Sequence, residues 1–260
     1  MNTPLLELKN VALGYDGKVL YRDVTLRVGR GEMVALLGAN GAGKSTLLRC
    51  VTGTLAPLDG TVEIAGRPLE GIPRRELARL VSLVNTGMTM AGALTVRELV
   101  GLGRQPHTGF LGLLSRHDRE VIDRSMEEVG MSALAGRQVA SLSDGERQKA
   151  MIARALAQET PVMVLDEPTA FLDVASRLET MQLLGSLARS EEKAVILSTH
   201  DIASALRLCQ RLWLIEDDDA GKRVIVDGTP ASLIADGALA SLFRGRRVSF
   251  DPSLMDFLPG

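Results

Sequence analysis

The spacing of hydrophobic residues changes along this chain, and the change outlines its architecture. In the first third, apolar and polar residues partly alternate, which predicts strands separated by glycine-containing turns, over 5–11, 19–28 and 61–64. From residue 94 to about residue 134 the apolar positions recur at helical spacing, as Val96, Leu99 and Val100 do. An N-terminal β-rich part is therefore followed by a helical part.

After residue 142, short and wholly apolar strands alternate with amphipathic helices. Strands are predicted over 162–165, 194–198 and 212–215, with helices over 174–187 and 202–208. Such strands are buried on both faces, as in a parallel sheet covered by helices. We therefore predict an α/β fold in which residues 1–85 and 160–260 form a core, with a parallel sheet and an N-terminal antiparallel β-subdomain, and residues 86–159 form an inserted helical subdomain.

Composition narrows the class of protein further. The 260 residues are 45% hydrophobic and 24% charged, which is ordinary for a soluble globular domain. The net charge of -2 offers no electrostatic argument for a nucleic-acid partner. Neither a signal peptide nor an apolar run of about 18 residues is visible, so we expect action in the cytoplasm. Cys50 and Cys209 lie on separate predicted helices and are expected to be buried thiols.

A glycine-rich segment lies between an apolar strand predicted at 33–37 and a helix predicted at 45–51. It consists of Gly38, Ala39, Asn40, Gly41, Ala42, Gly43, Lys44, Ser45 and Thr46. Glycines let successive main-chain N–H groups point at phosphate oxygens, and the helix N-terminus adds partial positive charge. Lys44 would neutralise the β- and γ-phosphates, and the Ser45 hydroxyl would hold Mg²⁺. A turn that binds nothing is the alternative, but the strand–loop–helix order favours a P-loop NTPase-type core that binds a nucleoside triphosphate.

Two carboxylates follow the buried strand predicted at 162–165. Asp166 stands where a parallel strand ends, within reach of a metal ion at the neighbouring P-loop. Glu167, one residue further, could orient or deprotonate an attacking water. A solvated acidic turn is the alternative interpretation, and the intact P-loop weakens it.

The segment 142–148 reads Leu-Ser-Asp-Gly-Glu-Arg-Gln and precedes a predicted helix. The segment resembles the signature motif of ATP-binding-cassette ATPases, usually Leu-Ser-Gly-Gly-Gln. The matching residues Ser143 and Gly145 are candidates, because a serine hydroxyl and a glycine N–H at a helix start can grip a γ-phosphate. Asp144 and Glu146 depart from that form, and Asp144 should point away from the phosphate or cap the helix.

That resemblance implies roles for three further residues, with ATP and Mg²⁺ as cofactors. Tyr15 would stack on adenine, although it could be an ordinary exposed strand tyrosine. Asp173, in the segment 171–173, would lie in the loop that crosses to a partner subunit. His200 would contact the γ-phosphate and join Lys44 and Glu167 in catalysis, although a lone histidine is more often structural.

The resemblance extends from residue 5 to about residue 250. Within the family, the segments 101–109 and 248–251 resemble ATPase subunits of importers for iron chelates, haem and cobalamin. This implies an ATP-hydrolysing subunit on the cytoplasmic face of the inner membrane, coupled to uptake. Its expected partners are a second copy in a head-to-tail dimer, permease subunits and, indirectly, an extracytoplasmic solute-binding protein.

Other classes of protein share the cassette. DNA-repair and chromosome-structure ATPases carry long coiled-coil insertions, and no sustained heptads occur here. Translation-factor ATPases have two cassettes in one chain, and this chain has one. A kinase would lack the signature segment.

One position departs from the family. A glutamine usually follows the strand predicted at 81–84, where it contacts Mg²⁺ and the attacking water. An ungapped comparison puts Thr86 in its place, preceded by Asn85. Either Thr86 reaches the Mg²⁺ shell through a water, or Asn85 does after a loop movement, or neither residue takes part.

Overall fold

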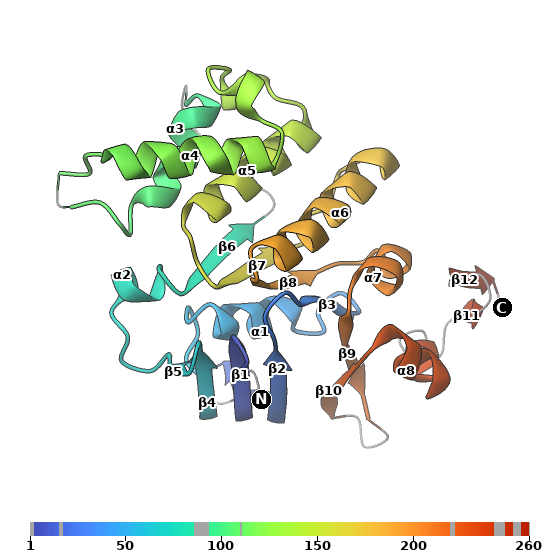
Figure 1. The fold of residues 1–260 in the computed structure, drawn as a ribbon. Coiled ribbons are helices and arrows are strands. Elements are labelled where there is room, and N and C mark those ends of the chain that lie inside the picture. The colour runs from blue at the N-terminus through green and yellow to red at the C-terminus, as the bar shows by residue number, and fades with distance from the viewer. Residues whose placement is uncertain are drawn as a thin grey trace.

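The structure is a computed structural model that describes residues 3–15, 18–85, 94–109, 111–218, 222–241, 248–251 and 256–259. Figure 1 shows a group of helices at the top, the larger sheet below them and the N-terminal sheet at the bottom, while β11 Val248–Asp251 and β12 Asp256–Pro259 pair as a short third sheet. The N-terminal sheet is antiparallel and has the order β2-β1-β4-β5, with β1 Leu6–Tyr15, β2 Lys18–Val28, β4 Asp59–Ile64 and β5 Arg67–Pro68. This is the predicted antiparallel β-subdomain.

The larger sheet forms the core. Its order is β10-β9-β3-β8-β7-β6, with β3 Met33–Gly38, β6 Val81–Asn85, β7 Val162–Asp166, β8 Ala194–Ser198, β9 Arg211–Asp217 and β10 Arg223–Gly228. The neighbours from β9 to β6 pair in parallel, and β10 joins the edge through an antiparallel hairpin with β9. The carboxyl ends of β3, β6, β7 and β8 therefore lie along one edge, where ligands of α/β proteins bind.

Both faces of this sheet are covered, as the apolar strands predicted. Along β3, Met33, Ala35 and Leu37 pack into one hydrophobic cluster, while Val34 and Leu36 pack into the other. The first cluster continues into the helical segment, and the second includes the antiparallel sheet and α1 Lys44–Val51. Alternate side chains of β3 therefore pack into the hydrophobic layers on the two opposite faces of the sheet.

The helices of the inserted segment begin at side-chain caps. Capping boxes pair Thr95 with Glu98 before α3 Val96–Gly101, and Ser115 with Asp118 before α4 Arg116–Glu128. Their apolar faces are buried, as predicted for Val96 and Leu99. The remaining elements are α2 Arg74–Leu77, η1 Leu102–Arg104, η2 Ser132–Leu134, η3 Val139–Ser141, α5 Asp144–Ala157, α6 Val174–Ser190, α7 Ile202–Leu208, α8 Pro230–Ala235, α9 Ala238–Ser241, β11 Val248–Asp251 and β12 Asp256–Pro259.

A buried ionic network ties η1 to the end of α5. The Arg104 guanidinium, only 2% exposed, donates to Asp118 Oδ1 at 2.8 Å, Ala157 O at 2.7 Å and Glu159 Oε2 at 2.6 Å. Next to it, the Gln158 side chain donates to Ala78 O at 2.6 Å and to Val81 O at 3.1 Å. The C-terminal end of α5 is therefore pinned to α2 and to the start of β6.

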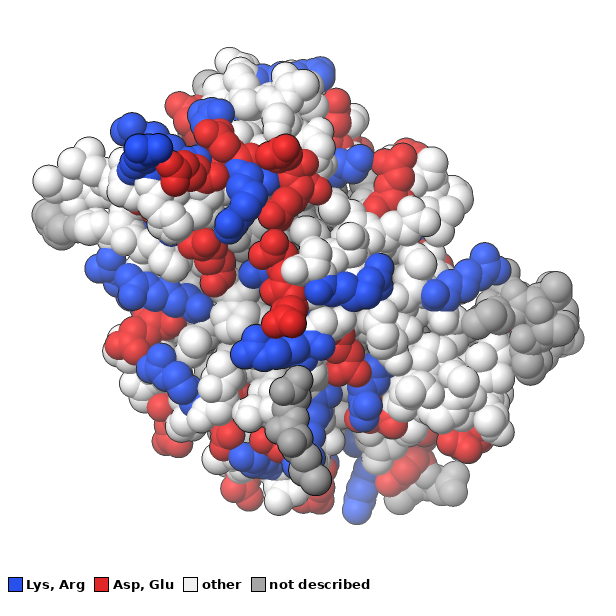
Figure 2. Space-filling view, in the orientation of Figure 1, with Lys and Arg blue, Asp and Glu red and all other residues white. Residues whose placement is uncertain are grey.

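Within the described residues, no helix combines the length and apolarity needed to cross a bilayer. On the face shown in Figure 2, acidic and basic side chains interleave. The two cysteines are buried free thiols, and burial raises the pKa of each to about 12. The domain boundaries at residues 85 and 160 stay a prediction.

Candidate functional site

The P-loop joins β3 to α1 and needs glycine at its tightest points. Gly41 and Gly43 have φ angles of +75° and +100°, a region that disfavours residues with a Cβ. A Cβ on Gly43 would lie 2.5 Å from the hydroxyl of Tyr21. That hydroxyl, from β2, donates to Ala42 O. The antiparallel sheet therefore supports the loop directly, through a tyrosine that the sequence pattern did not reveal.

Lys44 opens α1 and lies in the mouth of the loop. Its Nζ donates to Gly38 O at 2.9 Å and Ala39 O at 3.4 Å, and lies 3.5 Å from His200 Nε2. Only 7% of the residue is exposed, and this burial lowers the pKa of Lys44 although nearby carboxylates raise it. The structure thus brings together Lys44 and His200, which the sequence places 156 residues apart.

Two of the predicted metal ligands, Ser45 and Asp166, meet at the sheet edge. Asp166 is the last residue of β7, and its Oδ2 accepts a hydrogen bond from Ser45 Oγ at 3.3 Å. A carboxylate and a hydroxyl are hard oxygen donors, which suit Mg²⁺ when phosphate oxygens and waters complete the octahedron. Within the described residues no group of three or more His, Cys, Asp or Glu could hold a metal by itself. The donor set therefore fits a magnesium ion that arrives with a nucleotide.

Glu167 and His200 contact one another. Glu167 Oε1 lies 2.6 Å from His200 Nε2, and 47% of the His200 side chain is exposed. Glu167 has a φ of +49°, an uncommon conformation for a residue with a side chain and one that costs of order 1 kcal/mol. Its main-chain N–H donates to Ser198 Oγ at 2.8 Å. Two side chains that are predicted to act in catalysis therefore contact each other beside the P-loop.

The signature segment builds the start of α5. The Ser143 hydroxyl accepts from Glu146 N at 3.3 Å, while Ser143 N and Oγ donate to Glu146 Oε2 at 2.8 and 3.1 Å. These hydrogen bonds lower the pKa of Glu146. Asp144 forms an ion pair with Arg147 at 2.8 Å, so its charge is engaged along its own helix. The departures from the common motif form a capping box and a helical ion pair.

Asp173 and Gly145 lie on adjoining helix starts. Asp173 caps α6, because its carboxylate accepts from Ser176 N at 2.9 Å and from Ser176 Oγ at 2.8 Å. A Cβ on Gly145 would lie 3.2 Å from the same Ser176 oxygen. Beside them Phe171 is 89% exposed. The signature glycine and the predicted crossing loop therefore share one surface.

Tyr15 ends β1 and is 38% exposed. An Arg49 guanidinium nitrogen lies 3.5 Å from its hydroxyl, and a hydrogen bond with Thr46 lowers the pKa of Tyr15. The tyrosine thus lies next to α1, the helix that the P-loop opens. This position suits a ring that packs on a base whose phosphates occupy the loop.

Thr86 lies outside the described residues. Asn85 is described, and it ends β6 directly beside Asp166 in the parallel register. It lines a cavity of about 510 Å³ together with Ser45 and Asp166. Asn85 therefore stands at the same sheet edge as these two oxygen donors.

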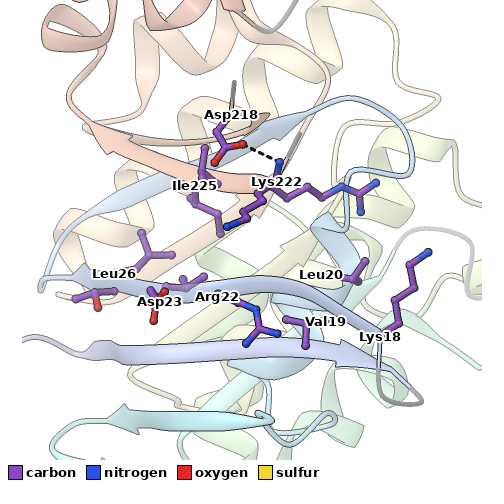
Figure 3. A pocket seen from close by; sticks show the side chains of 13 residues that line it. Lys18, Val19, Leu20, Arg22, Asp23, Leu26, Asp218, Lys222 and Ile225 are labelled. Carbon is purple, nitrogen blue, oxygen red and sulfur yellow. Dashed lines mark hydrogen bonds between the residues drawn. The ribbon is translucent and has the colours of Figure 1, made fainter. Parts of the chain in front are cut away.

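Figure 3 shows a larger groove, of about 760 Å³, between the edge strands β2 and β10. Lys18, Arg22 and Lys222 line it together with the half-buried Leu20 and Ile225. None of its lining residues belongs to the predicted nucleotide site. The contacts between polar side chains, rather than the volume of a groove, identify the candidate site.

Comparison with known proteins agrees with this geometry. The family model described as ABC transporter matches residues 21–170. This chain belongs to the ABC transporter family. The predictions of a cassette ATPase and of its α/β fold are therefore confirmed.

Relatives and solved structures share nearly the whole chain. The "Ferric enterobactin transport ATP-binding protein FepC" of Escherichia coli is 33% identical over 226 residues, which cover 87% of this chain and 82% of that protein. The "Cobalamin import ATP-binding protein BtuD" of Halobacterium salinarum is 37% identical over 249 residues, and the match spans 95% of this chain but 61% of that protein. The structure of cbiO1 from Clostridium perfringens, part of the transporter complex cbiONQ, has a TM-score of 0.79 at 26% identity and covers 91% of this chain and 93% of that one.

Proposed function

We propose that this chain is the ATP-hydrolysing subunit of a membrane importer and couples hydrolysis to uptake of an iron–siderophore, haem or cobalamin. The ATPase assignment rests on one observation, which is that Lys44, His200 and Glu167 contact one another in series at the strand ends. His200 Nε2 lies 3.5 Å from Lys44 Nζ and 2.6 Å from Glu167 Oε1. Relatives whose names specify ferric enterobactin and cobalamin support the solute class.

Each side chain has a part in binding and turnover. Main-chain N–H groups of the P-loop and Lys44 hold the phosphates, while Ser45 and Asp166 would hold Mg²⁺. When bound, the ion would supply positive charge that neutralises the phosphate oxygens. Glu167 orients the attacking water and accepts its proton, and His200 holds the γ-phosphate in line with that water. Tyr15 packs on the base.

Two copies complete the site. Ser143, Gly145 and Asp173 lie on helix starts separate from the P-loop of their own chain, so in a head-to-tail dimer they face the nucleotide of the partner copy. Binding of ATP between the copies favours the closed dimer, and hydrolysis releases it, which makes a ligand-biased two-state switch. The permease senses that switch at the cytoplasmic face of the inner membrane. An extracytoplasmic solute-binding protein delivers the solute to the permease.

The test is to purify the chain from detergent-solubilised membranes and identify what accompanies it. A permease, together with ATPase activity that the solute-loaded binding protein stimulates, supports an importer. Ribosomes or DNA in place of a permease would instead support a non-transport cassette ATPase. Uptake assays with a ferric siderophore, haem and cobalamin, in cells lacking this chain and in complemented cells, then identify the solute.

A further inference from the structure

Ser198 occupies a place between the two acidic residues of the site. It is the last residue of β8, is fully buried, and lies beside the end of β7. Its Oγ donates to Asp166 Oδ1 at 2.6 Å and accepts from Glu167 N at 2.8 Å. One hydroxyl therefore contacts both acidic residues at once, one through its proton and the other through its lone pair.

The contact with Asp166 fixes the direction of that carboxylate. With Oδ1 held by Ser198, Oδ2 is the oxygen that faces Ser45 Oγ, at 3.3 Å. A short hydrogen bond to an ionised carboxylate is stronger than one between neutral groups. Ser198 therefore selects which oxygen the carboxylate presents toward the predicted metal.

The contact with Glu167 acts on the main chain. Glu167 has the uncommon φ of +49°, and such a conformation persists only where surrounding contacts hold it. The Ser198 oxygen accepts a hydrogen bond from the Glu167 N–H at the end of the strands. The Glu167 side chain then lies 2.6 Å from His200 Nε2. The hydroxyl thus helps to aim the carboxylate that would receive the proton.

We propose that Ser198 is a positioning residue. Its single hydroxyl orients both the metal-ligating carboxylate of Asp166 and the base carboxylate of Glu167. The inference rests on the proposed function of Asp166 and Glu167. It assigns to Ser198 no contact with nucleotide or metal. Removal of the hydroxyl should therefore weaken metal binding and slow turnover while nucleotide affinity stays nearly unchanged.

The chain offers a matched control. Ser82 is also a buried serine, on β6 of the same sheet, two strands away from β8, and its hydroxyl accepts from Thr160 Oγ1 at 3.0 Å. Ser82→Ala removes a buried hydroxyl of the same strand layer but touches neither carboxylate. Any general loss of stability should affect Ser82→Ala and Ser198→Ala alike.

The experiment measures Mn²⁺ binding to the full chain by electron paramagnetic resonance, in the presence of a non-hydrolysable ATP analogue. Ser198→Ala should bind Mn²⁺ about ten-fold more weakly than the wild-type chain, which is the scale of one lost hydrogen bond to a charged group. Steady-state assays should show kcat lowered about ten-fold or more, with the KM for ATP changed less than about three-fold. Ser82→Ala should match the wild type in all three quantities.

The outcomes separate this inference from the function on which it rests. Wild-type protein that binds no Mn²⁺ beside the analogue would overturn the proposed metal site and the inference together. If the wild-type chain binds Mn²⁺ and the Ser198→Ala variant binds it equally well, the inference alone would be overturned. Equal losses in Ser198→Ala and Ser82→Ala would show a structural role and would also overturn it.

Discussion

The candidate site has a core half, which contains Lys44, Glu167 and His200, and a helical half, which contains Ser143 at the start of α5. The two halves are built in different ways. In the core, Lys44 at the start of α1 contacts His200, which follows β8, and His200 contacts Glu167, which follows β7. In the helical half, the hydrogen bonds of the Ser143 hydroxyl within the described residues all involve Glu146, three positions along the same helix. On the proposed function, the first half would bind phosphate within one chain, whereas the second would bind a nucleotide held by another chain.

The largest effect should come from the core half. Glu167→Gln keeps the shape of the side chain but removes the base, so turnover should fall roughly 100- to 10,000-fold while ATP binding persists. ATP-bound dimers should then accumulate, which gel filtration with ATP and Mg²⁺ would detect.

Glu192→Gln is a matched control, because Glu192 is an exposed glutamate with the same φ of +49°. It should hydrolyse ATP like the wild type. A Glu167→Gln variant that elutes as a monomer and turns over normally would refute the assigned role.

Lys44→Ala should have the next largest effect. It removes a charge-assisted contact to the phosphates, so the affinity for ATP should fall roughly 10- to 100-fold, as isothermal titration calorimetry would measure. The fold should persist, because in the described residues the hydrogen bonds of the Nζ go to the loop carbonyls of Gly38 and Ala39 and to the His200 imidazole, all within the site. Lys149→Ala, which loses an exposed pair with Glu179, should bind ATP normally. Equal affinities in both variants would argue against the P-loop assignment.

A smaller and more selective effect is expected in the helical half. Ser143→Ala should cost about 1 kcal/mol of unfolding free energy through loss of the cap, and should also prevent ATP-dependent dimerisation. ATP binding to the monomer should be unchanged. Ser115→Ala removes the equivalent cap of α4, so it should lose similar stability in denaturant titrations yet still dimerise. If both variants dimerise equally well, the division into two halves is wrong.

The smallest effect concerns the position where the family has glutamine. Thr86→Gln should preserve or raise ATPase activity, because the longer amide reaches further toward the metal. The double variant Asn85→Ala and Thr86→Ala should weaken the coupling of hydrolysis to uptake, measured as solute transported per ATP in proteoliposomes. Wild-type coupling in the double variant would show that neither residue takes part.

Much of this molecule could be predicted because its strongest signals are local. Wholly apolar runs predicted β7 and β8, and the glycine spacing predicted the P-loop between β3 and α1. Tyr21 and Ser198 were missed, because their roles depend on contacts between strands that are distant in sequence. A hydroxyl at the end of an apolar strand is a weak signal until the parallel register puts it beside the carboxylates.

The helical segment shows the same limit in a different way. The segment 101–109 resembles importer subunits, but no pattern within it predicts a buried charge. Arg104 is buried because Asp118 and Glu159, 14 and 55 residues away in sequence, both pair with it. Gly103 is needed because a Cβ would lie 2.2 Å from Arg154 O. Close packing of η1 on α5 accounts for both residues.

The C-terminal end of α5 is held in place by hydrogen bonds, so the helix can turn about that end as a rigid rod. Gln158 anchors one end to α2 and β6, and Ser143 stands at the other, across 14 helical residues. Such a helix is about 21 Å long, so a tilt of about 10° around its anchor moves Ser143 by roughly 4 Å. That displacement exceeds the length of a hydrogen bond. On the proposed function, a slight rotation about the anchored end would therefore be enough to bring Ser143 to a phosphate or to withdraw it.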